Sequence, residues 1–97
     1  MMTVALAAIA FASPSPVLPI PVARARALRE ARHAARLFHP PPRSAIRSCH
    51  RRSRTVVDCV AGFTFPAGDV CTRSFRVSYI SVTDHRLRSR ALGDPMC

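Results

Sequence analysis

The stretch that decides the fold is residues 54–82, which read RTVVDCVAGFTFPAGDVCTRSFRVSYISV. Its first part, residues 54–61, is rich in the β-branched residues that suit a half-buried strand. Its last part, residues 70–82, alternates apolar and polar side chains with a period of two. Between them, residues 62–69 carry Pro66 and Gly68, which favour a turn. The stretch therefore predicts two antiparallel strands joined by a turn.

The same alternation continues on both sides of this pair. Residues 44–49 predict a preceding strand, which reaches residues 54–61 through a basic turn at 50–53. Residues 86–92 predict a fourth strand after a turn at Asp84 and His85. Four successive strands with short connections predict an antiparallel meander. The side chains expected on its core face are Val57, Cys59, Ala61, Cys71, Phe75, Val77, Tyr79, Leu87, Ser89 and Ala91.

A helix is expected before the sheet, over residues 22–38. This stretch is built from the good helix formers Ala, Arg, Leu and Glu, and the prolines at 40–42 prevent its continuation. Its apolar residues lie within one third of the circumference and its basic residues lie opposite. The apolar set is Ala27, Leu28, Ala31, Ala34, Ala35 and Phe38, and the basic set is Arg29, Arg32, His33 and Arg36. The sequence thus predicts an α+β fold, with one N-terminal helix packed on a four-stranded meander.

The amino-terminal segment resembles an export signal. Residues 1–12 form an apolar run that is shorter than the ~20 residues needed to cross a bilayer. The run ends in the small-x-small site Ala10-Phe11-Ala12. We therefore expect a secreted protein cleaved after Ala12, with a Pro-rich linker over residues 13–21 and one domain over residues 22–97.

Four cysteines, Cys49, Cys59, Cys71 and Cys97, all lie in the expected mature part. An even set in a small exported chain predicts two disulfides. With a turn at 50–53, Cys59 would lie ~17 Å along the strand from the position opposite Cys49, which disfavours that pairing. We expect Cys59–Cys71 with Cys49–Cys97, and the pairing Cys49–Cys71 with Cys59–Cys97 stays open.

The run Ser53-Arg54-Thr55-Val56-Val57-Asp58-Cys59, together with the other three cysteines, resembles small exported Cys- and Arg-rich proteins of GC-rich actinobacteria. The resemblance covers about residues 23–97 and depends on one short motif. It implies an exported helix-plus-meander domain. That group has no known activity, so the resemblance implies no mechanism.

The charge of the chain is its clearest functional signal. All 15 basic residues are Arg against five acids, which gives a formal net charge of +10. Strand alternation gathers five of these side chains on the face away from the helix, as a candidate anion-binding row: Arg54, Arg76, Arg86, Arg88 and Arg90. Asp58 is expected to balance Arg54 or Arg76 there. The partner would be an anionic envelope polymer or an acidic protein, and export argues against nucleic acid.

No catalytic arrangement emerges from the sequence. Neighbouring strand residues point to opposite faces, so His50 is badly placed to activate Cys49, and the cysteine spacings do not suit zinc. We expect no enzyme, no metal and no cofactor. Two alternatives to a binding domain remain, a cationic membrane-active protein and a small protease inhibitor that uses the loop Gly62–Asp69.

Overall fold

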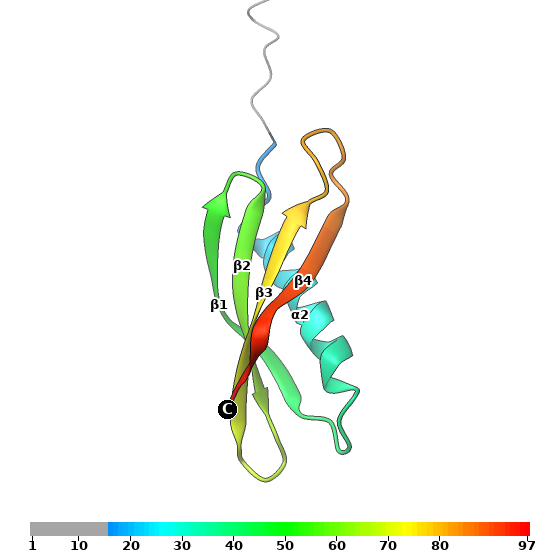
Figure 1. The fold of residues 1–97 in the computed structure, drawn as a ribbon, viewed down its shortest axis with the longest axis vertical. Coiled ribbons are helices and arrows are strands. Elements are labelled where there is room, and N and C mark those ends of the chain that lie inside the picture. The colour runs from blue at the N-terminus through cyan, green and yellow to red at the C-terminus, as the bar shows by residue number, and fades with distance from the viewer. Residues whose placement is uncertain (1–15) are drawn as a thin grey trace, which may run out of the picture.

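The computed structural model describes residues 16–97, which form one helix and a four-stranded sheet (Figure 1). The elements are α2 (Ile20–Ala35), β1 (Arg43–Ser53), β2 (Val56–Thr64), β3 (Val70–Tyr79) and β4 (Leu87–Met96). The strands lie in the order β1-β2-β3-β4, and all neighbours are antiparallel. The predicted α+β meander is confirmed. The predicted signal peptide and cleavage site lie outside the described residues.

Helix α2 begins two residues earlier and ends three residues earlier than predicted. Pro19 precedes it in an extended conformation and Pro21 lies in its first turn, where a missing N–H costs no helical hydrogen bond. Its buried face is a stripe of alanines at four-residue intervals, Ala23, Ala27, Ala31 and Ala35. Phe38 lies past the helix end and is 48% exposed, so its assignment to the helical packing face was wrong.

The strand faces agree with the predicted alternation. Val57, Cys59 and Ala61 of β2 and Val77 of β3 are fully buried, and Phe75 nearly so. Tyr79, Leu87 and Ala91 pack partly against them. Because α2 lies over this face (Figure 1), small alanines meet larger strand side chains across the interface. The core is therefore a single layer between one helix and one sheet face.

The first hairpin turns later than predicted, and this corrects the disulfide pairing. Strand β1 runs through the expected turn to Ser53, and Arg54 and Thr55 form the turn instead. Cys49 is then directly opposite Cys59, and these two are bonded, with their Cα atoms 4.0 Å apart. The second disulfide joins Cys71 to Cys97.

Both sets of disulfide pairs that the sequence favoured, Cys59–Cys71 with Cys49–Cys97 and Cys49–Cys71 with Cys59–Cys97, are therefore wrong. Strand β2 continues to Thr64, so Cys71 lies opposite Phe63. On β2, Cys59 is four residues from Phe63, which is ~13 Å in an extended strand. That distance is too long for a disulfide between Cys59 and Cys71. The position of one turn thus decides which cysteines meet.

The segment before the helix contributes to the domain. Leu18, which lies in the predicted Pro-rich linker, is fully buried. Its N–H donates to the carbonyl oxygen of Arg54 at 2.7 Å, and Arg51 donates to its carbonyl oxygen. The chain is therefore attached to the β1–β2 turn before α2 begins.

Candidate anion-binding face

The face of the sheet turned away from α2 carries the polar residues of the central strands. On β2 and β3 these are Asp58, Ser74, Arg76 and Ser78, which alternate with the buried core residues. The strand pairing then places Ser78 opposite Arg88, and Arg76 opposite Arg90. We call this surface the open face. No helix among residues 16–97 covers it, so its side chains are held mainly by one another.

Asp58 is the central acid of the open face. Arg76 donates to both of its oxygens, from Nε to Oδ1 at 2.8 Å and from Nη2 to Oδ2 at 3.0 Å. Arg52 donates from Nε to Oδ2 at 2.7 Å. These two guanidinium groups, Arg76 foremost, hold the pKa of Asp58 below its ordinary value although burial opposes this. The carboxylate stays ionised, and two arginines outweigh its charge.

Arg88 and Arg90 extend this positive region to the edge strand. They lie two residues apart on β4 and line one shallow groove together with Val56, Arg76, Ser78 and Ser89. Within residues 16–97, neither guanidinium has an ion pair or hydrogen bond to the protein. Both are exposed. They are therefore free to take an external anion, by the forked geometry that suits phosphate and carboxylate.

The remaining two predicted arginines do not line this groove. Arg86 precedes β4 and pairs with Asp84 at 2.7 Å. That contact lowers the pKa of Asp84 and raises the pKa of Arg86. Arg54 lies in the β1–β2 turn, and its backbone carbonyl holds Leu18. The structure thus brings together three of the five arginines of the predicted row.

Sequence reasoning missed Arg52 and His50, because it placed both in a turn. They lie on β1, and together with Asp58, Val60, Ser74 and Leu92 they line a second shallow hollow of the open face. His50 is opposite Asp58 in the strand pairing. Of the two alternative partners expected for Asp58, Arg76 is confirmed, and Arg52 is a second partner that was not expected. Extending the strand alternation past Cys49 is the signal that identifies these residues.

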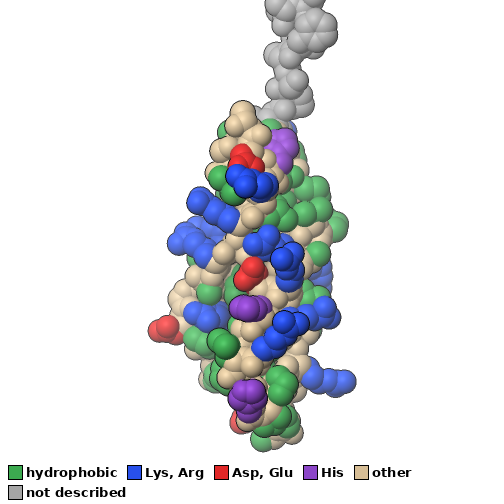
Figure 2. Space-filling view, turned by 90° about the vertical axis from the view of Figure 1, so that its right-hand side faces the viewer, with side chains coloured by type: hydrophobic (Ala, Val, Ile, Leu, Met, Phe, Trp, Pro, Cys, Tyr) green, Lys and Arg blue, Asp and Glu red, His purple; other side chains and the backbone are tan. Residues whose placement is uncertain are grey.

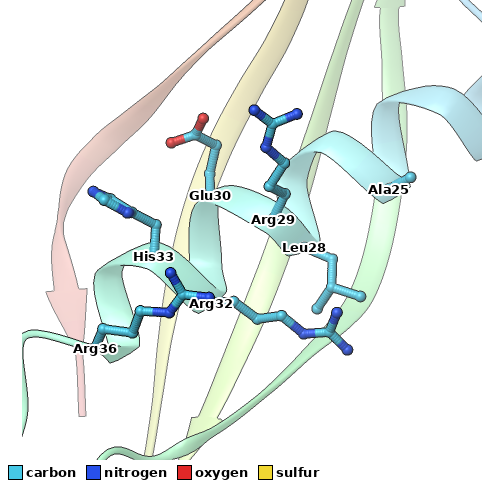
Figure 3. A pocket seen from close by; sticks show the side chains of 7 residues that line it. All are labelled: Ala25, Leu28, Arg29, Glu30, Arg32, His33 and Arg36. Atoms are coloured by element: carbon cyan, nitrogen blue, oxygen red, sulfur yellow. The ribbon is translucent and has the colours of Figure 1, made fainter.

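A second basic surface lies on the outward side of α2. Its exposed residues include Arg29, Arg32, His33 and Arg36, as the helical pattern predicts. The hollow among them is lined only by residues of the helix and its cap (Figure 3), so no second element encloses it. Basic side chains also outnumber acidic ones over the face seen in Figure 2. Positive charge is therefore widespread, and the open face differs in having its charges ordered by strand pairing.

The described residues also bear on the other chemistries that the sequence raised. All four cysteines are in disulfides, which leaves Cys49 without a thiol for nucleophilic catalysis. No group of three potential metal ligands is found among residues 16–97. Over the same residues, no helix has both the length and the hydropathy for a membrane span. The loop suggested for protease inhibition is shorter than predicted, because Gly62, Phe63 and Thr64 belong to β2.

Comparison with known proteins yields no relative: no family model, curated protein or solved structure matches the chain. The resemblance to exported actinobacterial proteins therefore stays a prediction.

Proposed function

We propose that this protein is an exported, non-catalytic domain that binds an anionic polymer of the cell exterior through its open face. The observation that carries the proposal is the pair of unpartnered arginines, Arg88 and Arg90, beside the Arg76–Asp58 pair. Two disulfides in so small a chain support an oxidising compartment.

The arrangement favours binding of a polymer over a single ion. Residues two apart on a strand are separated by ~6.8 Å, so Arg88 and Arg90 present successive cations along β4. Each exposed contact is weak in water and is screened over ~8 Å at physiological salt. Once one contact with a polymer has formed, the next contact on the same chain is intramolecular and has a high effective concentration. A single small anion lacks this gain in affinity. We therefore expect moderate, salt-sensitive affinity for polyanions and little for free phosphate.

A matched pair of variants tests the location of the site. Arg88→Gln with Arg90→Gln removes two charges from the open face, and Arg29→Gln with Arg32→Gln removes two from α2. Binding to an immobilised polyol-phosphate polymer is measured by titration at low and at physiological salt. We expect the first variant to lose about 5- to 30-fold in affinity, since each of the two charged contacts contributes ~0.5–1 kcal/mol, and the second variant to lose much less.

Equal losses in both variants would show that net charge alone drives binding and would contradict the proposal. Unchanged binding in the Arg88/Arg90 variant would also contradict it. Release of dye from anionic liposomes by the wild-type protein, without polymer binding, would instead support the membrane-active alternative.

A further inference from the structure

The disulfide Cys71–Cys97 has no part in the proposed function, because it does not line the groove of the open face. It borders an apolar groove at the end of the molecule where α2 stops and the β2–β3 hairpin turns. The groove is lined by apolar side chains, among them Phe38, Phe65 and Pro95, and by Arg73 and both cysteines. Cys97 is exposed, whereas Cys71 is buried, with 7% of its surface accessible to solvent. One sulfur-bearing residue of this pair is thus open to a reactant and the other is shielded.

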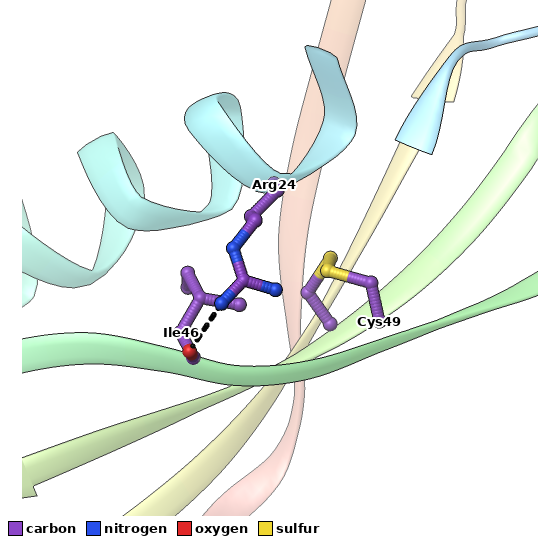
Figure 4. The surroundings of a disulfide bond; sticks show 4 residues. Arg24, Ile46 and Cys49 are labelled. Carbon is purple, nitrogen blue, oxygen red and sulfur yellow. Dashed lines mark hydrogen bonds between the residues drawn. A yellow bond between two sulfur atoms is a disulfide. The ribbon is translucent and has the colours of Figure 1, made fainter. Parts of the chain in front are cut away.

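The disulfide Cys49–Cys59 is less accessible to a reactant. Cys49 and Cys59 are direct partners in the β1–β2 ladder, with paired residues on both sides of them (Ser48↔Val60 and His50↔Asp58), and Cys59 is fully buried. Arg24 of α2 lies beside this disulfide and donates from Nη2 to the carbonyl oxygen of Ile46 at 2.9 Å (Figure 4). Helix and strand therefore hinder approach to Cys49–Cys59.

The chain that carries Cys97 is loosely attached. Residues 93–97 are all exposed, and the β3–β4 pairing shifts register between Ser74↔Leu92 and Thr72↔Met96. Besides that last pair, Arg73 donates from Nε to the carbonyl oxygen of Gly93 at 3.2 Å. Opening the Cys71–Cys97 bond would free residues 93–97 and leave the ladder from Leu87 to Leu92 in place, because that ladder lies on the other side of the register shift.

We propose that Cys71–Cys97 is a thiol-exchange site, and that its opening releases residues 93–97 while the domain stays folded. An incoming thiolate attacks Sγ of Cys97, a bond forms between these two sulfurs, and the Sγ–Sγ bond to Cys71 breaks. Cys71 receives the electron pair and leaves as a thiolate. A second equivalent of thiol can then attack the mixed disulfide, which gives the oxidised reactant and two protein thiols.

Charge selects the class of reactant. The chain carries +10 and Arg73 lines the groove beside both cysteines. A positive field concentrates anions, and a nearby guanidinium stabilises a departing thiolate. Anionic low-molecular-weight thiols are therefore the expected reactants, and reduced glutathione is a suitable probe.

The test is a time course on the folded wild-type protein with excess reduced glutathione, quenched by acid and analysed by peptide mass spectrometry. We expect the glutathione adduct on Cys97 and a free thiol on Cys71. Opening of Cys49–Cys59 should be slower by about tenfold or more, since access limits exchange at a buried disulfide. Far-UV circular dichroism should stay unchanged while the first bond opens.

A control variant, Cys71→Ser with Cys97→Ser, should keep the sheet spectrum and form no adduct over the same time. Faster opening of Cys49–Cys59, adducts formed mainly on Cys71, or loss of the folded spectrum together with the first bond would each overturn the proposal. So would an unfolded spectrum of the control variant, because the second disulfide would then be needed for the fold.

Discussion

At the residue scale, Asp58 shows how a charge is held on a sheet face without a covering helix. It is 8% exposed, although it lies on the open face, because arginine side chains from β1 and β3 lie against it. A carboxylate buried this far needs partners for its lone pairs, and the two guanidinium groups supply three donors. The acid thereby also fixes Arg76 beside the groove that Arg90 lines.

Replacing Asp58 by Asn should destabilise the protein by about 1–3 kcal/mol at neutral pH, because hydrogen bonds to a charged partner are lost and two cations remain together. Urea denaturation measures the change. Asp84→Asn is the matched control: it removes an acid from an exposed pair with Arg86, and we expect little loss. Equal losses in the two variants would show that burial of Asp58 has no energetic consequence.

The ion pair between Asp58 and its arginines also predicts how the stability of the folded protein depends on pH. Since the pKa of Asp58 is lowered on folding from its ordinary value of 3.8, the stabilisation is fully present above that value. It is lost as the pH falls through the lower, folded-state pKa. The stability difference between wild type and Asp58→Asn should therefore be constant near neutrality and shrink below about pH 4.

At the element scale, the helix–sheet interface depends on small side chains. Four alanines, one on every turn, allow α2 to approach the sheet closely, but each buries little apolar surface. Close approach leaves no room for a larger residue. The stability of this interface therefore comes more from the larger side chains of the strands than from the alanines of the helix.

We expect Ala31→Leu to destabilise the protein by about 1–3 kcal/mol through overpacking. Ala25→Leu makes the same change on an exposed position of α2 and should have almost no effect. Thermal denaturation of both variants compares them directly. An unchanged melting temperature for Ala31→Leu would mean that the interface can adjust its spacing.

At the scale of the whole molecule, the segment before α2 closes one end of the core. Leu18 is among the largest fully buried side chains, and a backbone hydrogen bond to Arg54 and a side-chain hydrogen bond from Arg51 tie it to the β1–β2 hairpin. Residues far apart in sequence thus meet at the end where the first hairpin turns. The folded unit includes part of the stretch that composition alone marks as a linker.

Leu18→Ala should cost about 2–5 kcal/mol, the range for truncating a fully buried leucine. Val17→Ala is the natural comparison, because Val17 is 44% exposed and precedes it directly. Chemical denaturation at neutral pH measures both. If Leu18→Ala were as mild as Val17→Ala, the segment would be dispensable for folding.

Local patterns in the sequence were sufficient for the fold class and the strand faces. The prolines at 40–42 end the helix, and alternation with a period of two assigns Val57, Cys59 and Val77 to the core. Both signals act over a few residues and need no knowledge of distant contacts. The same alternation offered Arg54 and Arg76 as alternative partners of Asp58, and the strand pairing places Arg76 opposite it.

Only the tertiary structure decided the disulfide pairing, the second arginine on Asp58 and the place of Leu18. All three depend on where the β1–β2 hairpin turns, at Arg54 and Thr55. Moving that turn from residues 50–53 changes which residues of β1 and β2 are opposite each other, so Cys49 meets Cys59 and Arg52 reaches Asp58. Register is a property of two paired strands and their packing, and the turn residues alone favour several solutions.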